Sequence, residues 1–356
     1  MHPPNTSDAG YAFAQHMLPQ VSRTFALTIP QLPAPLRDTV TNAYLLCRIA
    51  DTVEDEPTLG ADRKHELQAL FLDAIDDPDK ALVFSREVAP LLSSHMLDAE
   101  HELIGGADKV IATTRALPLR QRSALTRCLR IMCQGMSRFQ QHKSVRGLAT
   151  LADLREYCYV VAGVVGEMLT ELFCDHSNAI ESNRQRLMAQ SVAFGRGLQM
   201  TNILKDIWED RAADTCWLPR EVFDQCGFDL SDLSPDRQDE SYQDGLHTLI
   251  GHAHASLREA LAYTQAIPSS EVGIRRFCLW SIGLAVLTLR KIARHPHYTA
   301  GHEVKVSRRA VRATIALSNL AGRSNRLVGG AFNWFTRDLP LPAAAAPAAL
   351  SSPAGS

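Results

Sequence analysis

The sequence predicts an all-α protein. Apolar residues recur at intervals of three and four over most of the 356 residues, which is the period of an amphipathic helix. No stretch of useful length alternates apolar and polar residues, as a half-buried strand would. Prolines separate the periodic segments, as expected where one helix ends and another begins. Length alone does not decide between one domain and two.

Nine segments carry the helical period over ten or more positions. In chain order they are 36–53, 63–75, 82–92, 119–141, 151–173, 185–208, 245–265, 274–292 and 308–327. Proline ends helices because it lacks an amide hydrogen and its ring clashes with the carbonyl of the preceding turn. The joints are marked by Pro30 to Pro35, Pro57, Pro78, Pro118, Pro219, Pro268 and Pro296. We therefore expect nine main helices joined by short turns.

Small residues interrupt one of these helices, at Ala162, Gly163 and Gly166. A glycine inside a helix costs about 1 kcal/mol relative to alanine, so these positions indicate close approach by another helix or by an extended ligand. Close helix packing is the simpler explanation. Tyr157 and Tyr159 precede the glycines and could face a cavity, where aromatic rings stabilise cations.

Composition excludes several classes of protein. The formal net charge is −2 with both signs interspersed, so we expect no nucleic-acid partner. The eight cysteines are scattered singly in apolar contexts, which is typical of reduced core residues in a cytoplasmic protein. The N-terminus lacks a secretory pattern, and the apolar stretch 277–289 is too short to span a bilayer. A cytoplasmic protein follows.

We expect three divisions of the chain. Residues 1–18 form an N-terminal extension, and residues 19–335 form the helical domain. Residues 336–356, rich in Ala, Pro, Ser and Gly, form a low-complexity tail that we expect to be disordered and dispensable for catalysis.

Two acidic segments far apart in the sequence share one spacing. Asp51 and Asp55 are four residues apart, and so are Asn202, Asp206 and Asp210 in turn. Residues four apart lie on the same face of a helix, where like charges repel. We therefore expect a cation there, and oxygen ligands without cysteine or histidine suit Mg²⁺. Two such faces across one cavity would hold a diphosphate.

A solvated helix face is the alternative explanation for either acidic segment alone. Apolar runs precede both segments, at residues 43–50 and 197–201. Charges on buried helices cost free energy unless they are paired or bind a metal. These runs therefore favour the metal site.

Basic residues accompany the acidic segments. Arg48 lies three residues before Asp51, Lys205 immediately precedes Asp206, and Arg23 lies near the start of the chain. Each alone would be an ordinary surface charge. Together they suit the diphosphate oxygens that Mg²⁺ leaves free, and neutralising a departing diphosphate lowers the barrier to ionisation of the C–O bond.

Four segments, in the same order, resemble the motifs of the squalene/phytoene synthase family, the head-to-head branch of the trans-prenyl synthases. They are VSRTF (21–25), RIADTVED (48–55), YCYVVAGVVG (157–166) and QMTNILKDIWED (199–210). The resemblance runs from about residue 21 to about residue 310, and it is greatest to the bacterial squalene synthase members. It implies a single bundle of helices around a deep central cavity, the isoprenoid synthase fold.

The resemblance also implies a reaction. Two prenyl diphosphates bind; one ionises to an allylic cation, the double bond of the other attacks it, and proton loss closes a cyclopropane. The product is presqualene diphosphate when both substrates are farnesyl diphosphate. The implied Mg²⁺ ligands are Asp51, Glu54, Asp55, Asn202, Asp206 and Asp210. Of these, Asp51, Asp55, Asp206 and Asp210 are taken as catalytic together with Tyr157, which would orient or stabilise the cation.

The same motifs supply the implied substrate and cofactor contacts. The basic ones are Arg23, Arg48 and Lys205, where the squalene branch often has arginine in place of Lys205. A lysine keeps the charge but loses the bidentate fork. The polar and aromatic ones are Ser22, Phe25, Tyr44, Gln199 and Phe277.

The second half-reaction decides the product. Reduction by NADPH gives squalene, whereas proton loss gives dehydrosqualene or phytoene, and an enzyme could also stop at presqualene diphosphate. No GxGxxG fingerprint is present. The region from Phe277 to Arg309 resembles the squalene version, in which Lys305 and Arg308 would contact NADPH. Ser307 stands where an arginine is typical, and Arg308 could substitute for it if this segment is a mobile loop.

Two further expectations concern partners. An enzyme with greasy substrates and product would contact the inner membrane face peripherally, through an apolar surface near the cavity mouth. The oligomeric state is not readable. A non-catalytic prenyl-diphosphate carrier is the remote alternative, and both acidic segments with Tyr157 argue against it, since a carrier needs no second metal face.

Overall fold

The structure is a computed structural model, and it describes residues 6–141 and 143–342. These residues form helices and connecting loops, and no strand occurs among them. Two isolated bridges, Leu148 with Pro219 and Ser234 with Arg237, are the only β-type pairs in this part of the chain. The predicted all-α class is confirmed.

The helices are α1 (Thr6–Val21), α2 (Phe25–Thr28), α3 (Ala34–Asp55), α4 (Ala61–Ala74), α5 (Pro78–Val88), α6 (Asp98–Gly105), α7 (Ala107–Ala116), α8 (Leu119–Gln140), α9 (Leu151–Cys158), α10 (Val164–His176), α11 (Asn178–Glu181), α12 (Arg184–Lys205), α13 (Ile207–Ala212), α14 (Arg220–Gln225), α15 (Glu240–Ala266), α16 (Val272–Arg294), α17 (Arg308–Ala321) and α18 (Asn325–Thr336). A π-helical turn, η3 (Tyr159–Gly163), joins α9 to α10. Short 3-10 turns lie at Ile29–Gln31, Ala89–Leu91 and Leu230–Asp232.

Each of the nine predicted segments falls on helix, but 151–173, 185–208 and 308–327 each span two α-helices. Helix α17 ends at Ala321, and α18 starts at Asn325 after Gly322 and Ser324. The Ser324 hydroxyl accepts a hydrogen bond from the amide of Leu327, so it caps the second helix. Helices α1, α2, α6, α7, α11 and α14 lie outside the predicted segments.

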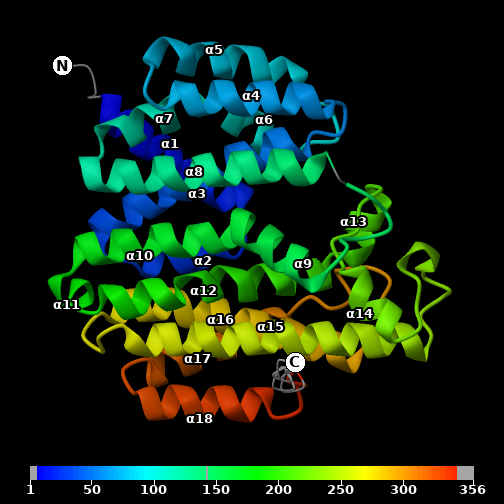
Figure 1. Cartoon of the computed structure of the whole chain (residues 1–356). Helices are drawn as coiled ribbons and strands as arrows, with labels where there is room; N and C mark the ends of the chain where they lie inside the picture. Colours follow the sequence, from blue (N-terminus) through cyan, green and yellow to red (C-terminus); the bar gives the residue numbers. More distant parts are fainter. Residues whose placement is uncertain (1–5, 142, 343–356) are drawn as a thin grey trace, which may run out of the picture.

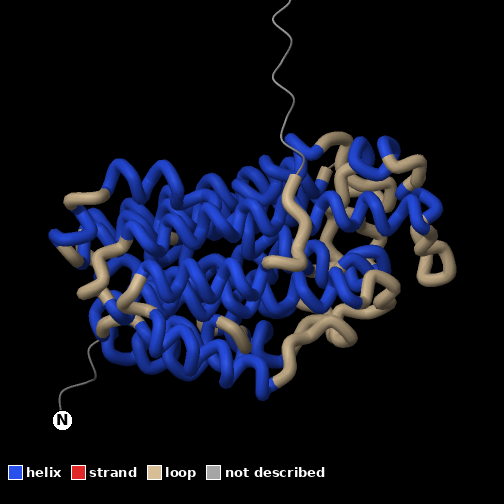
Figure 2. Tube along the Cα trace, turned by 90° about the horizontal axis from the view of Figure 1, so that it is seen from below, coloured by secondary structure: helices blue, strands red, loops and turns tan. Residues whose placement is uncertain are grey.

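The helices stack in layers (Figure 1). Helices α4 and α5 lie at the top of that view, α3 and α8 below them, then α10 and α12, then α15 and α16, with α17 and α18 at the bottom edge. Helix α12 packs against α10, η3, α15 and α16, so the second acidic segment begins on a helix in the middle of the bundle. The long loops gather mainly at one end of the bundle (Figure 2).

Backbone contact between α12 and the glycine segment explains the small residues. A Cβ atom at Gly195 would lie 1.9 Å from the carbonyl oxygen of Ala162, and one at Gly166 would lie 2.2 Å from that of Ser191. Only glycine permits backbones to approach so closely. The close helix packing expected from Gly163 and Gly166 is therefore observed, and it holds Tyr157 in a fixed position relative to the second acidic segment.

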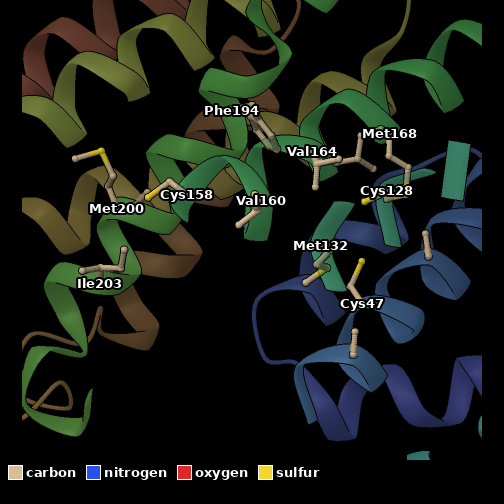
Figure 3. Close-up of a cluster of buried hydrophobic side chains, with 14 of the residues drawn as sticks. Cys47, Cys128, Met132, Cys158, Val160, Val164, Met168, Phe194, Met200 and Ile203 are labelled. Atoms are coloured by element: carbon tan, nitrogen blue, oxygen red, sulfur yellow. The ribbon is translucent and has the colours of Figure 1, made fainter. Parts of the chain in front are cut away.

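The interior between the two acidic helices is apolar and rich in sulfur. Figure 3 shows buried side chains that converge from α3, α8, α9, η3, α10 and α12. Methionine and cysteine adapt their shape to irregular spaces, which suits a deformable interior. The labelled residues are Cys47, Cys128, Met132, Cys158, Val160, Val164, Met168, Phe194, Met200 and Ile203. All eight cysteines are free and seven are buried, as expected for reduced core residues.

The ends of the described chain pack on the bundle. Residues 6–18, set apart above as an extension, belong to α1, which packs against α3 and α7 and buries Ala14, Met17 and Leu18. At the other end, the carbonyl of Pro340 hydrogen-bonds His254 of α15 at 2.7 Å, so residues 336–342 follow the protein surface. Residues 1–5 and 343–356, which hold the rest of the predicted extension and tail, lie outside the described residues. The division at 18, 19 and 335 stays a prediction.

Two helical stretches are long and apolar enough to cross a membrane, Leu151–His176 and Val272–Arg294. The second stretch, Val272–Arg294, is longer than the apolar stretch 277–289 that the sequence analysis judged too short to span a bilayer. The protein interior encloses 67% and 61% of their most apolar windows, which is typical of core helices.

Replacing Gly195 by alanine tests the close contact. A Cβ there meets backbone that cannot rotate away, so we expect the free energy of unfolding to fall by about 2 to 4 kcal/mol in denaturant titration. Gly330→Ala is the matched control. Gly330 lies inside α18, and no atom lies within 4 Å of the position that an alanine Cβ would take, so alanine should leave stability unchanged or raise it by up to about 1 kcal/mol. Equal effects at both sites would contradict the packing argument.

Candidate active site

The first acidic segment ends helix α3. Its side chains Asp51, Glu54 and Asp55 sit in the last turn, and the preceding turns are almost entirely buried. Glu54 accepts a short hydrogen bond from the Gln140 side chain of α8. The amine of Lys64 donates to the Glu54 backbone carbonyl, which neutralises part of the negative end of the helix. Side chains of α8 and α4 therefore hold the last turn of α3 in position.

The second acidic segment spans a break in the helix. Helix α12 ends at Lys205, Asp206 has non-helical angles, and α13 starts at Ile207. The spacing survives the break, because the amide of Asp206 donates to Asn202 and that of Asp210 donates to Asp206, both at 2.9 Å. Asn202, Asp206 and Asp210 thus remain on one face.

The two segments meet at one cavity of about 340 Å³. Seven of the predicted site residues line it, together with six others. The predicted ones are Glu54, Asp55, Tyr157, Gln199, Asn202, Asp206 and Asp210. The others are Gln140, Lys143, Ile203, Ala213, Thr215 and Trp217. Asp51 lies one helical turn before Asp55 and is not in the wall itself.

The carboxyl groups repel one another across this cavity. Burial, and after it the charge of Asp55, raises the pKa of Asp51 to about 7 and that of Glu54 to about 8. Burial raises the pKa of Asp210 to about 7 as well, and the charges that add to this effect include both Asp206 and Asp55. A carboxylate on one segment therefore acts on the other segment, although the two lie some 150 residues apart in sequence. The site is short of positive charge.

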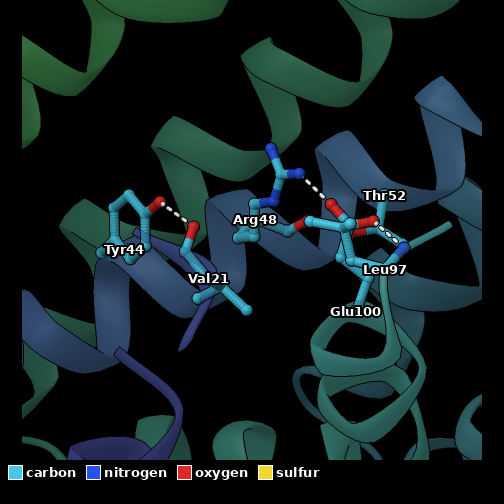
Figure 4. A network of polar contacts seen from close by, with 6 residues as sticks. All are labelled: Val21, Tyr44, Arg48, Thr52, Leu97 and Glu100. Carbon is cyan, nitrogen blue, oxygen red and sulfur yellow. Dashed lines mark hydrogen bonds and ion pairs between the residues drawn. The ribbon is translucent and has the colours of Figure 1, made fainter. Parts of the chain in front are cut away.

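Arg48 lies on the same helix as the first acidic segment and pairs with a buried acid. Its guanidinium donates to Glu100, whose side chain is only 5% exposed (Figure 4). Glu100 also accepts from the Leu97 amide at 2.9 Å, so α6 holds the arginine in place. Burial works to lower the pKa of Arg48, but the charges of the surrounding acids, Asp51 first and then Glu100, outweigh it and raise that pKa. The guanidinium therefore stays charged.

The N-terminal motif lies beside Arg48. The phenol of Tyr44 donates to the Val21 carbonyl at 3.1 Å (Figure 4). The rings of Phe25 and Tyr44 are 5.1 Å apart. The Ser22 hydroxyl accepts a hydrogen bond at 3.0 Å from the amide of Phe25, the first residue of α2. Arg23 is exposed. None of these side chains lines the described cavity wall.

Tyr157 lies in the cavity wall inside an aromatic stack. Trp217 covers its ring at 3.9 Å with an interplanar angle of 10°, and Phe139 meets it edge-on at 5.2 Å. Burial and the nearby Glu54 raise the pKa of Tyr157 well above 10, so its phenol stays protonated. Because the indole covers one face of the ring, Tyr157 presents its hydroxyl edge and at most one face to a ligand. Tyr159 instead lies by Glu167 and Arg127, outside the cavity wall.

The C-terminal basic segment is attached to the second acidic segment. Glu209 accepts from the Gly301 amide at 2.8 Å, and the indole of Trp208 donates to the Tyr298 carbonyl at 2.7 Å. Lys305 follows in the same loop and is exposed. Ser307 caps α17 by accepting a hydrogen bond from the Ala310 amide, so Arg308 starts a helix. It therefore does not lie in the mobile loop that would let it substitute for an arginine at position 307.

Phe277 is enclosed among aromatic rings and does not line the described cavity. It is 1% exposed and packs edge-on against Phe173 at 6.2 Å and at a tilt against Phe194 at 6.3 Å.

Lys205 forms an ion pair with Asp206 at 3.0 Å. The structure thus brings Lys205 to the cavity edge and leaves Phe277 in the apolar interior.

Four polar or aromatic wall residues were not among the predicted site residues: Gln140, Lys143, Thr215 and Trp217. They lie at helix ends and in loops, where periodicity carries no signal. The pair Trp217-Leu218 before Pro219 looks like a helix stop in the sequence. Only the fold shows that the stop places Trp217 on Tyr157.

The donor set fits Mg²⁺ bound jointly with a phosphate ligand. It consists of hard oxygens, which that ion prefers. Among the described residues, however, no three acidic, histidine or cysteine side chains converge on one point. Each face therefore offers one or two carboxylates and leaves the remaining coordination positions to a substrate, as is usual for Mg²⁺.

Metal-free protein should lose stability as the pH rises from about 6.5 to 8. The folded pKa values of Asp51, Glu54 and Asp210 lie above the unfolded value of about 4, so the folded state binds more protons and stability falls with rising pH. The melting temperature in chelator at both pH values measures this. Asp210→Asn should flatten the dependence. A melting temperature that rises over this window would contradict the described repulsion.

Comparisons with known proteins identify the family. The family model described as squalene/phytoene synthase matches residues 18–310. Curated relatives include squalene synthase ERG9 of Gibberella zeae, 28% identical over 77% of this chain, and squalene synthase of Nicotiana benthamiana, 30% identical over 78%. The chain spans 57% and 64% of the lengths of those two relatives.

Solved structures share the fold. A ligand complex of the protein designated TcSQS superposes with a TM-score of 0.76 at 22% identity, covering 95% of this chain and 94% of that one. A dehydrosqualene synthase gives 0.61 at 18% identity, covering 87% and 95%. The predicted single bundle of this type is confirmed. The chain belongs to the squalene/phytoene synthase family.

Proposed function

We propose that this protein is a prenyltransferase that joins two molecules of farnesyl diphosphate head to head through presqualene diphosphate. The observation that carries the proposal is the cavity in which Asp55 of one helix and Asp210 of another act on each other, with Tyr157 in the same wall. A carrier would need one diphosphate site. Two facing acidic segments suit two diphosphates, or one that is held while it leaves.

The proposed Mg²⁺ ligands are Asp51, Glu54 and Asp55 on one side and Asn202, Asp206 and Asp210 on the other. Mg²⁺ bound there supplies the positive charge that stabilises the departing diphosphate. The raised pKa values support this assignment, since repelling carboxylates are the groups that a cation would stabilise most.

Basic side chains complete the diphosphate site. Arg48, held by Glu100, and Lys205, paired with Asp206, each have donors left for phosphate oxygens. Lys143 lines the cavity and adds a third positive charge. These cations bind the leaving diphosphate as the allylic C–O bond breaks and its electron pair departs with oxygen. Arg23, Ser22, Phe25 and Tyr44 would shape the neighbouring substrate region behind Arg48.

Tyr157 would act as a neutral phenol at the carbocation. Its raised pKa makes it a poor base at neutral pH, so its part is to orient the substrate with its hydroxyl group and exposed edge. Trp217 holds the ring in one orientation. The double bond of the second prenyl diphosphate attacks the allylic cation, and loss of one proton closes the cyclopropane. The apolar interior lined with methionine and cysteine would take the prenyl chains.

We propose squalene as the final product, with NADPH as reductant. The loop that carries Lys305 is tied to the second acidic segment through the contacts of Gly301 with Glu209 and of Tyr298 with Trp208, and these contacts support a cofactor site next to that segment. Arg308 on α17 would be the second basic contact, and Phe277 would line the interior. Dehydrosqualene or phytoene, formed by proton loss without reduction, and arrest at presqualene diphosphate are the alternatives. We further propose a cytoplasmic enzyme that contacts the membrane peripherally.

Product analysis separates these outcomes. Purified protein is incubated with farnesyl diphosphate and Mg²⁺, with and without NADPH, and the hydrocarbon is identified. We expect squalene only when NADPH is present, because hydride must reach the second cation. Geranylgeranyl diphosphate is the control substrate. Phytoene from it as the sole efficient product would overturn the proposal, and dehydrosqualene in both incubations would establish the non-reducing alternative.

A further inference from the structure

The last two helices form a strongly basic part of the chain. Residues 304–337 contain seven arginines and lysines and no acidic residue, whereas the formal net charge of the whole chain is −2. All seven are exposed, and the five that follow Arg308 are Arg309, Arg312, Arg323, Arg326 and Arg337. Among the described residues no ion pair involves the first four of these five, and Arg337 pairs with its neighbour Asp338 at 3.5 Å.

The same helices carry exposed apolar side chains. Leu320 is 81% exposed, and Leu327 and Trp334 are each 58% exposed. Leu327 and Trp334 are seven residues apart and therefore lie on one face of α18, two turns apart. Five of the eleven large apolar side chains exposed in the described chain lie within residues 317–341. The remainder are scattered over other elements, so this is where exposed apolar surface concentrates.

The opposite faces of these helices bind the body of the protein. Val328 and Phe332 of α18 are buried, and they line an apolar groove of about 80 Å³ with Leu279 and Val286 of α16. Only Ala321 of α17 is buried. Helices α17 and α18 thus lie along the edge of the bundle (Figure 1), with an inner apolar face on α16 and an outer face of leucine, tryptophan and arginine.

We propose that the outer face of α17 and α18 docks on a membrane surface that contains anionic lipids. Leucine and tryptophan side chains insert at the boundary between headgroups and acyl chains, and tryptophan prefers this depth. Arginines beside them bind lipid phosphates and are attracted by a negative surface. Arg337 stacks over the Trp334 ring at 5.4 Å, so a cation and an interfacial aromatic group are held together. The proposal rests on the peripheral membrane contact proposed above and not on the reaction catalysed.

Two other partners for the outer face of α17 and α18 fit its positive charge less well than a membrane does. A second copy using the same face would bring two sets of arginines together, which is unfavourable. Residues 343–356 contain no charged side chain and cannot neutralise the arginines. An anionic membrane supplies both the apolar medium and the negative charge. The docking surface also differs from the expected one near the cavity mouth, because the cavity wall comes from α3, α8, α9, α12, α13 and the loop that follows.

Intrinsic fluorescence tests the docking surface directly. Trp334 is the exposed tryptophan, while Trp208, Trp217 and Trp280 are each less than 10% exposed. The full chain is mixed with phosphatidylcholine vesicles that contain either no anionic lipid or about 30% phosphatidylglycerol. We expect a blue shift only with the anionic vesicles, weakened by high salt and absent in Trp334→Phe. Co-sedimentation should show at least about ten-fold weaker vesicle binding for Leu320→Ser with Arg323→Glu.

The matched control is Leu119→Ser with Arg120→Glu, because Leu119 is a 69% exposed leucine next to an exposed arginine at the start of α8. It should bind vesicles like the unaltered protein, and circular dichroism shows that both variants fold. Equal binding to both vesicle types, or equal losses in the two variants, would refute the proposal. So would a lipid-free dimer that Leu320→Ser with Arg323→Glu dissociates, or vesicle binding that appears only after residues 343–356 are deleted.

Discussion

Repulsion between carboxyl groups enclosed in one cavity is the constraint on which this structure depends. Asp51, Glu54 and Asp210 all have pKa values near 7 or 8, because protein surrounds them and their neighbours are also acidic. A protein gains no stability from such an arrangement. We propose that its explanation lies in a bound metal ion, which would bring the positive charge, while the oxygens of a diphosphate would complete its coordination shell.

The remaining fold keeps those groups at a fixed separation. Direct backbone contact holds α12 against the π-helical turn at Gly195 and against α10 at Gly166, and Glu100 holds Arg48 in place. π-helical turns inside α-helices are frequent at functional sites. The stack of Trp217 on Tyr157 removes the freedom of the ring. Rigid helices carry the charges, and loops supply the outer wall.

Helical periodicity was sufficient to predict the class of fold and the main helices, since each long helix buries one face. It was also sufficient to place Asp206 and Asp210 on one face, because the spacing survives the break at Asp206. It did not find Trp217 or Lys143, which reach the cavity from loops whose path depends on tertiary contacts. It did not anticipate that α1 packs in the body. The predicted helical segment 308–327 does start where α17 starts, directly after its cap Ser307, so Arg308 is helical and does not lie in a mobile loop. Side-chain capping and long-range packing leave weak traces in a single sequence.

The central proposal is that the two acidic segments hold the leaving diphosphate between them, one from each side. A double-mutant cycle on Mg²⁺-dependent pyrophosphate binding, measured by calorimetry for the unaltered protein, Asp55→Asn, Asp210→Asn and the double variant, tests it most directly. The control is Asp73→Asn, because Asp73 of α4 forms an exposed ion pair with Lys80 of α5. We expect each single change to weaken binding by about ten-fold or more, and the double change to cost less free energy than the two single costs combined, because either loss opens the same clamp. Independent effects that simply add, or binding that needs no Mg²⁺, would contradict the account.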